Sequence, residues 1–199
     1  MRNLRKDMPR LTPENKELHT AEMREKICRT FAELFAVDGE VSMDRLAETV
    51  GVAKGTIYNY FKDKSELITA VMETRRVIMV ELMERTIPPD APPEEQLGSF
   101  IRIMIDDFNR HRHLRTEYLR NNPVRPVPGK IRPGDILKRI IRRGIDLGVF
   151  RENDVEETAL FVFCSLTGKF RYLLLRNRDA DPETEYRIIM HFLLPALKK

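Results

Sequence analysis

Several features that would indicate an enzyme are missing from this sequence of 199 residues. No stretch alternates apolar and polar residues as a strand does, and no glycine-rich loop follows a strand to hold phosphates. The two cysteines, Cys28 and Cys164, have no second cysteine or histidine at a metal-binding spacing. Both lie in apolar, helical surroundings, so we expect reduced, buried thiols and no disulfide framework.

Histidines and acidic residues also lack catalytic or metal-binding arrangements. His111 and His113 are two residues apart. On a helix their side chains point in directions about 200° apart, so one ion cannot easily take both. The other two histidines stand alone, and Asp106 and Asp107 are adjacent and therefore lie on different helix faces. We expect no catalytic residue, no metal site and no cofactor.

The chain also lacks a secretion signal and a long apolar run. Its N-terminus is polar, and the longest apolar stretch, residues 159–166, is far too short to span a bilayer. One third of the residues are charged, 42% are hydrophobic and the net charge is only +4. These values predict a soluble, cytoplasmic protein with no membrane partner and with one small and one larger core.

What the sequence does contain is a helix, a tight turn and a second short helix between Val41 and Leu67. Ser42 can cap the first helix with its side-chain oxygen. One apolar stripe at helical spacing follows, formed by Met43, Leu46, Ala47 and Val50. Gly51 tolerates positive φ and can end this helix.

The second helix, from about Ala53 to Tyr60, has a narrow buried side, since only Ile57 and Phe61 recur at helical spacing. Its other faces carry hydrogen-bonding and aromatic groups that suit phosphates and base edges, namely Lys54, Thr56, Tyr58, Asn59 and Tyr60. A helix, a tight glycine turn and a short polar and aromatic helix form the helix-turn-helix pattern of DNA-binding proteins.

This stretch resembles the DNA-binding signature of the TetR family of transcriptional regulators. The resemblance is carried by Leu46-Ala47, Gly51-Val52, Lys54-Gly55-Thr56, Tyr58, Tyr60-Phe61, Lys64 and Glu66-Leu67. The sequence departs from the signature at Val50, where the family usually has Ala. It departs again at Ala53, where Ser or Thr usually begins the recognition helix, so one cap and one phosphate contact are missing.

The resemblance implies a role for each of the matching polar residues. Lys54, Gly55, Thr56 and Asn59 are placed to reach the major groove. Tyr58, Tyr60 and Lys64 are placed to reach phosphates, and Ser42 belongs to the same predicted DNA-binding set. Gly55 leaves a gap in the helix surface that lets the backbone approach DNA closely.

The sequence as a whole predicts an all-α chain with three parts. These are a basic flexible arm at 1–13, a three-helix DNA-binding domain at 14–66, and a larger helical effector-binding and dimerisation domain at 67–199. A helix up to Val37 precedes the motif. The helices expected after the motif cover residues 64–86, 94–114 or beyond, 135–147, 155–178 and 182–197, with proline-rich breaks at 88–93 and 121–134.

The helix expected at 155–178 is apolar nearly all round its early turns. Such a helix needs both a core and a partner surface, and the last helix is too short to supply all of that cover. We therefore expect a homodimer in which the last two helices pair with their copies around a twofold axis. The family resemblance implies the same arrangement.

The net charge of the predicted DNA-binding region does not favour DNA binding, because residues 1–66 contain 12 basic and 12 acidic side chains. A DNA-binding surface needs local positive charge. That charge would have to come from the arm, from Lys54, Lys62 and Lys64, from helix N-termini, and from Arg24, Lys26 and Arg29. The arm lies in a minor groove or is a solvated tail; the sequence leaves both interpretations open.

A basic block at residues 110–143 has 11 Lys and Arg residues against two acids, Glu117 and Asp135. Three interpretations remain: a solvated face, extra contact with DNA phosphates, or binding of a small-molecule effector. Arginines would hold the charged part of an anionic effector with an apolar body, such as an acyl thioester of coenzyme A. The candidate pocket residues for its apolar part are Phe100, Met104, Phe108, Phe161, Phe163 and Cys164.

These observations predict a dimeric, sequence-specific DNA-binding transcriptional regulator, a repressor that a small molecule releases from a double-stranded, pseudo-palindromic operator. In this mechanism two recognition helices enter successive major grooves, and the effector favours a separation of the heads that no longer fits both. The alternative is a helical dimer that binds a ligand or a protein and carries a degenerate DNA-binding head.

Overall fold

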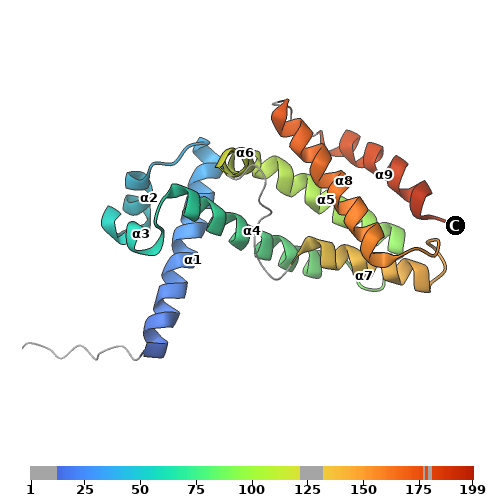
Figure 1. Cartoon of the computed structure of the whole chain (residues 1–199), viewed down its shortest axis with the longest axis horizontal. Coiled ribbons are helices and arrows are strands. Elements are labelled where there is room, and N and C mark those ends of the chain that lie inside the picture. The colour runs from blue at the N-terminus through green and yellow to red at the C-terminus, as the bar shows by residue number, and fades with distance from the viewer. Residues whose placement is uncertain (1–12, 122–131, 177, 179–180) are drawn as a thin grey trace, which may run out of the picture. The chain divides into compact units, whose positions relative to one another are not determined.

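The computed structural model describes residues 13–121, 132–176, 178 and 181–199 (Figure 1). Regular structure within these ranges is helical, apart from one isolated bridge between Phe150 and Lys198. The prediction of an all-α fold is therefore confirmed. The arm predicted at residues 1–13 lies outside the described residues except for Pro13, where α1 begins.

The chain divides into two compact units, Met1–Leu67 and Ile68–Lys199. The helix α4 (Lys64–Thr86) runs across this boundary without interruption. One continuous helix is thus the covalent connection between the two units.

The first unit, which we call the head, contains α1 (Pro13–Asp38), α2 (Met43–Val50) and α3 (Lys54–Tyr60). Each of these helices contacts the other two. Their apolar faces meet in one small core, formed mainly by Ile27, Phe31, Phe35, Leu46, Val50, Ile57 and Phe61. The rings of Phe31 and Phe35 lie 5.3 Å apart between centroids. This core holds α3 by its narrow apolar side and leaves its polar side free.

The second unit contains the rest of α4 together with α5 (Pro93–Arg110), α6 (Arg112–Asn121), α7 (Pro133–Asp146), α8 (Val155–Leu175) and α9 (Pro182–Leu197). Helix α5 packs against α7 and α9, and α7 packs against α8. The apolar faces of α4, α5, α7, α8 and α9 contribute to a single core that begins in α4 at Met79. The buried residues of α6 lie outside this core cluster.

One helix predicted from the sequence is two helices in the structure. The expected helix from 94 to 114 or beyond breaks at His111, which has φ −123° and ψ 21°, and α6 begins at the next residue. No proline or glycine lies at this break. In a straight helix, residues eight apart are separated by about 12 Å along the axis. The break instead brings Arg115 of α6 back to the carboxylate of Asp107 in α5.

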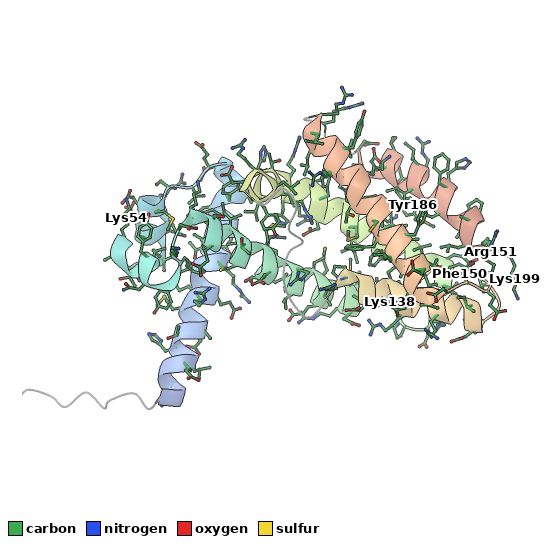
Figure 2. All side chains as sticks on the ribbon, viewed as in Figure 1. Lys54, Lys138, Phe150, Arg151, Tyr186 and Lys199 are labelled. Atoms are coloured by element: carbon green, nitrogen blue, oxygen red, sulfur yellow. The ribbon has the colours of Figure 1, made fainter. Side chains whose placement is uncertain are left out.

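The C-terminal end of the chain is tied to the segment that follows α7. The ring of Phe150 fills the space beside Gly144, where an added Cβ would lie 2.1 Å from a ring carbon. The Arg151 side chain donates hydrogen bonds to the carbonyls of Lys198, at 2.9 Å, and Pro195, at 3.0 Å. Phe150, Arg151 and Lys199 accordingly lie together in Figure 2. These contacts hold the end of α9 beside the end of α7.

Candidate DNA-binding surface and effector region

The turn between α2 and α3 has the geometry that the sequence predicts. The Oγ of Ser42 accepts a hydrogen bond from the Arg45 N–H at 3.2 Å and caps α2. Gly51 ends the helix with φ 81°, a left-handed conformation that glycine adopts without a steric penalty. The N–H of Gly51 and the N–H of Val52 both donate to the Ala47 carbonyl. These contacts fix the direction in which α3 begins.

Helix α3 is anchored on one side and open on the other. Ile57 is fully buried and Phe61 nearly so, while Lys54, Gly55 and Asn59 are exposed. Tyr58 is 44% exposed, and Thr56 and Tyr60 are half-buried. The predicted groove residues therefore share the solvent side of one short helix. No atom lies within 4 Å of a Cβ built on Gly55, which leaves this backbone open to close approach.

Lys54, which the resemblance assigns to the groove, is held by an acid that the sequence reasoning overlooked. Its Nζ lies 2.8 Å from the Asp44 carboxylate on α2. The hydrogen bond to Asp44, together with its negative charge, raises the pKa of Lys54 above its ordinary value. Both side chains are exposed, so the pair is weak and the lysine can exchange it for a phosphate. Lys54 lies at the edge of the head in Figure 2.

Two cations of α1 have structural roles inside the head. Arg24 Nη1 donates a hydrogen bond to the Tyr60 carbonyl at the end of α3, and its guanidinium lies 4.3 Å from the centre of the Phe61 ring. Lys26 Nζ donates to the Val50 carbonyl at the end of α2, at 3.0 Å. Both cations therefore sit at the C-terminal ends of helices, where positive charge is favourable. These contacts engage them within the head, whereas the sequence suggested a contribution to DNA binding.

The start of α4 lies directly after α3 in the chain and carries Lys64, which is half-buried. Asp63 caps this helix, since its Oδ1 accepts a hydrogen bond from the Glu66 N–H at 2.8 Å. Lys64 is therefore in the first turn of a capped helix, where free N–H groups favour anions. This position suits a phosphate contact.

The structure divides the six predicted effector residues between two environments. Phe100, Met104 and Phe108 belong to the core of the second unit, where Phe108 stacks on Phe170 with ring centroids 4.6 Å apart. Phe163 is half-buried against the same core. Phe161, however, is 71% exposed, and Cys164 is exposed as well. These two side chains do not line an interior pocket with the others, and the expectation that Cys164 is buried is wrong. Cys28 is buried as expected.

Phe161 and Cys164 belong instead to an outward stripe on α8. Its members recur at intervals of one, three and four residues, which places them on one side of the helix: Leu160, Phe161, Cys164, Ser165, Gly168, Arg171, Tyr172 and Leu175. A matching exposed stripe on α9 contains Ile188, His191, Phe192 and Pro195. We call the two together the α8–α9 face.

The longest apolar run in the sequence is only part of helix α8, and the whole helix is much longer than that run. Although its longest apolar run is short, an 18-residue window of the 21-residue helix has a mean hydropathy of 1.3, so the helix is long and apolar enough to cross a membrane. Only 28% of that window is buried within the chain. Its opposite side, however, carries Val162, Leu166 and Phe170 into the core of the second unit. This helix therefore has a core-facing side and an uncovered apolar side.

Four of the nine described cations of the basic block pair with acids that lie outside it in sequence. Arg110 pairs with Asp106 at 3.0 Å, and Arg139 pairs with Glu84 at 2.6 Å. Lys138 forms an ion pair with Glu156. Arg125 and Lys130 lie outside the described residues. The large positive charge counted along the sequence is thus much reduced in space.

Part of the block lines an open hollow of about 430 Å³ between α7 and the start of α8. It has four cations, two acids and two apolar side chains, namely Lys138, Arg139, Arg142, Arg143, Asp146, Glu156, Leu147 and Val155. Arg143 also donates to the Pro89 carbonyl at 2.6 Å and to the Asp90 carbonyl at 3.2 Å. Within the described ranges, no group of three His, Cys, Asp or Glu side chains is placed to hold a metal ion.

Comparison with known proteins gives the same picture of the head. Residues 32–71 match the family model of bacterial regulatory proteins of the tetR family. The fatty acid metabolism regulator protein of Bacillus subtilis (strain 168) is 28% identical over 159 residues, covering 75% of this chain and 82% of that protein.

Solved structures share the fold over most of the chain. The transcriptional regulator FadR from Bacillus subtilis, solved with stearoyl-CoA, has a TM-score of 0.64 at 20% identity and covers 85% of this chain and 96% of its own. A regulator-type protein from Saccharomonospora viridis, solved with choline, has a TM-score of 0.68 at 17% identity, with coverage of 90% and 99%. One bound ligand is an anionic lipid conjugate and the other is a small cation.

Proposed function

We propose that the chain, whose residues 32–71 match the tetR family model, is a ligand-responsive, DNA-binding transcriptional regulator of the TetR type. We propose further that it is a cytoplasmic repressor that an anionic acyl effector releases from its operator. The observation that carries the DNA-binding part is the open polar side of α3, held in place by Ile57 and Phe61. The effector part rests on the charges around α7 and on the likeness to the fatty acid regulator.

For DNA, we propose that α3 enters the major groove. Lys54, Thr56 and Asn59 then face base edges, and the Gly55 backbone approaches the groove closely. Tyr58, Tyr60 and Lys64 contact phosphates, and Ser42 at the start of α2 lies in the same surface. Because Lys54 is paired with Asp44 in the free head, it gives up this partner on binding. Exchange of this surface pair costs little, because water screens the attraction between exposed charges.

For assembly, we propose that the α8–α9 face is the dimer interface and that two copies form a four-helix contact. Phe161 and Phe192 are each 71% exposed, and Leu175 is 76% exposed. Large exposed apolar patches of this kind are typical of protein interfaces. Twofold pairing also explains why α8 is apolar on both sides, and it provides two recognition helices for a pseudo-palindromic operator.

For the effector, we propose an acyl thioester whose phosphates bind near the hollow at α7. The lining has four cations against two acids, and Arg142 presents a guanidinium group that suits phosphate, whereas Arg143 is held by the Pro89 and Asp90 carbonyls. The acyl chain would enter between α5 and α8, beside Phe100, Met104, Phe108 and Phe163. These side chains are packed within the core, so entry of the chain has to move α5 and α8 apart. That movement supplies the differential affinity that a ligand needs to shift a conformational equilibrium.

Calorimetry tests the effector directly. Stearoyl-CoA should bind with an affinity that falls as salt rises, while free coenzyme A and methyl stearate should each bind at least about tenfold more weakly, because each lacks one part of the recognised molecule. Replacing Arg142 by Gln should weaken stearoyl-CoA binding. Arg110→Gln is the matched control, because Arg110 is an exposed partner of Asp106 outside the hollow. Release from DNA by choline or by neutral aromatics, with no effect of stearoyl-CoA, would contradict the proposed ligand class.

The alternative of a degenerate head has one specific observation in its favour. Lys54, Arg24 and Lys26 all have partners within the head, so few cations of the described head are left for phosphates. A gel-shift experiment with the DNA that flanks the protein's own coding region separates the two functions. Retarded DNA supports the regulator, and unshifted DNA together with effector binding supports a ligand-binding module.

A further inference from the structure

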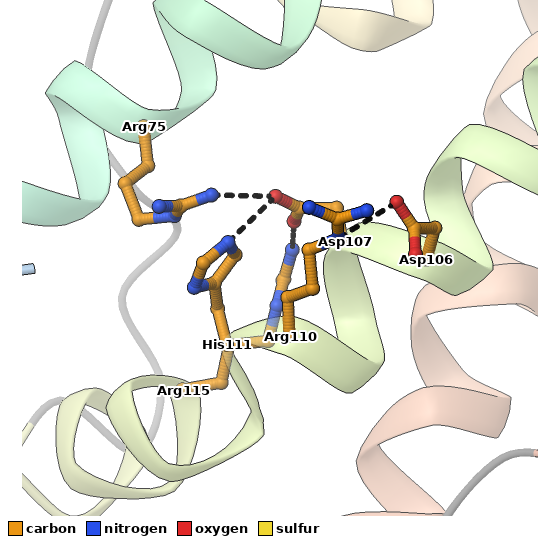
Figure 3. A network of polar contacts seen from close by, with 6 residues as sticks. All are labelled: Arg75, Asp106, Asp107, Arg110, His111 and Arg115. Atoms are coloured by element: carbon orange, nitrogen blue, oxygen red, sulfur yellow. Dashed lines mark hydrogen bonds and ion pairs between the residues drawn. The ribbon is translucent and has the colours of Figure 1, made fainter. Parts of the chain in front are cut away.

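A buried polar network joins three helices of the second unit at the break between α5 and α6 (Figure 3). The Asp107 carboxylate of α5 lies at its centre. Its Oδ1 accepts a hydrogen bond from Arg75 of α4 at 3.1 Å, and its Oδ2 accepts one from Arg115 of α6. The side chains of Asp107 and Arg75 are only 12% and 19% exposed. One carboxylate thus connects α4 and α6 to α5.

Asp107 is the negative charge that Arg75 and Arg115 share in this network. Burial raises the pKa of Asp107, but the charges of Arg115 and Arg75 outweigh it and hold the pKa below its ordinary value. Burial and the charge of Arg75 lower the pKa of His111 to about 4, so this ring is neutral at neutral pH. Two guanidinium groups therefore share one negative charge. Without the carboxylate they would face each other unpaired, which drives α4 and α6 apart.

Arg75 lies in the part of α4 between the core of the second unit and the head, so a contact at Arg75 can affect the direction of α4 toward the head. The core cluster of the second unit includes α4 from Met79 onward, and the boundary between the units lies after Leu67. Between these points Ile68, Val71 and Met72 are buried outside that cluster. Leu67 and Met79 are twelve positions apart, which is about 18 Å along the helix axis. A tilt of about 10° at Met79 would therefore move the start of the head by about 3 Å. Within that span, Arg75 ties α4 to α5.

We propose that the Asp107–Arg75 pair positions the head for operator binding by fixing the tilt of α4, an inference that rests on the proposed DNA-binding function. The pair acts at a distance from DNA, through the direction of one helix. Its loss should therefore change how strictly the dimer measures the distance between half-sites. Contact between one head and one half-site should be unaffected.

The test compares four variants on DNA. A twofold operator is first selected from random duplexes by the wild-type protein, and its two half-sites are then moved one base pair apart or together, which also rotates one relative to the other by about 34°. Arg75→Gln removes the tie while leaving Asp107 neutralised by Arg115, so it should fold well. Asp107→Asn removes both ties. Arg75→Lys keeps the charge, and Asp106→Asn is the matched control, because Asp106 pairs with exposed Arg110 and makes no ion pair with Arg75 or Arg115 among the described residues.

Wild type and Asp106→Asn should lose affinity about tenfold or more on the altered spacings. On the same altered spacings, Arg75→Gln and Asp107→Asn should lose about threefold or less of their operator affinity. The loss for Arg75→Lys should lie between these values and that of the wild type. Affinity for a single half-site should be the same in all of them. If Arg75→Gln and Asp107→Asn show the wild-type spacing penalty, or if their affinity for one half-site falls equally, the proposed positioning role is overturned.

Hydrogen exchange on the same proteins provides a readout that needs no DNA. Amides of residues 68–78 should exchange about tenfold or more faster in Arg75→Gln and Asp107→Asn than in Asp106→Asn, while those of residues 43–60 should be unchanged. Unchanged exchange in 68–78 would overturn the tie. If the wild-type protein selects no DNA but the variants show these differences in exchange, the proposed DNA-binding function is wrong, while the restraint of α4 by the Asp107–Arg75 pair still holds.

Discussion

Replacing Phe161 by Asp should convert the protein into a monomer that binds its operator at least about a hundredfold more weakly than the wild type. Phe161 is 71% exposed on the α8–α9 face, and twofold symmetry places two copies of each substitution in one interface. Truncating one central aromatic side chain typically costs an interface about 2–4 kcal/mol, and an unpaired buried carboxylate adds to that cost. Sedimentation velocity at micromolar concentration measures the assembly, and fluorescence anisotropy measures operator affinity.

Leu147→Asp is the matched control for this experiment, since Leu147 is 58% exposed but lies outside α8 and α9. The control should stay dimeric. Leu174 on the same helix is unsuitable for this test, because it is half-buried against the core of the second unit and its replacement by Asp would report folding instead. A monomeric wild type, or a Phe161→Asp variant that remains dimeric, would remove the α8–α9 face as the interface.

Replacing Lys64 by Ala should weaken binding to all DNA sequences alike. Each dimer presents two copies of Lys64, so the variant loses two phosphate contacts and the slope of log affinity against log salt should fall by about 1.8. Combining Lys64→Ala with Tyr58→Ala should reduce operator affinity about a hundredfold or more, because each change is made twice per operator. Thr56→Ala and Asn59→Ala should instead change which half-site is preferred, since these side chains face base edges.

Lys138→Ala is the matched control for the salt experiment. Lys138 is paired with Glu156 in the second unit, so its loss should leave the salt slope unchanged. If Lys64→Ala and Tyr58→Ala both bind operator with the wild-type affinity and salt slope, the assignment of α3 as the recognition helix is wrong.

The head was largely predictable from sequence because its determinants are local. Ser42 caps the helix that follows it, Gly51 supplies the positive φ that ends that helix, and Ile57 and Phe61 recur at the spacing of one helical face. Each of these features acts within a few residues. Ala53 makes no side-chain cap in the structure, as its chemistry requires.

The second unit was harder because its determinants come from residues far apart in sequence. The break at His111 carries no glycine or proline signal and accompanies contacts of Asp107 with Arg75 and Arg115. The basic block looked strongly charged because its partners, such as Glu84 and Glu156, lie on other helices. Counting charges along a sequence cannot find such pairs.

The exposed side of α8 shows the same difficulty in another form. In a sequence, an apolar residue that packs in the core cannot be distinguished from one that contacts a second copy of the chain. Val162 and Phe163 pack on the core of the second unit, while their neighbour Phe161 is outside it. Only the packing of α8 against α7 decides which side of the helix faces inward. Phe161 and Cys164, which the sequence grouped with residues of the core, are therefore exposed in the structure.

Selection of binding sites from random double-stranded DNA by the full-length protein tests the central claim most directly. The account predicts enrichment of one twofold-symmetric sequence whose half-sites lie about one helical turn, or a whole number of turns, apart. Binding to that sequence should disappear when Tyr58 and Lys64 are both replaced by Ala. Enrichment of no sequence, or of a sequence that the double variant binds equally well, would contradict a DNA-binding regulator that reads its operator through α3.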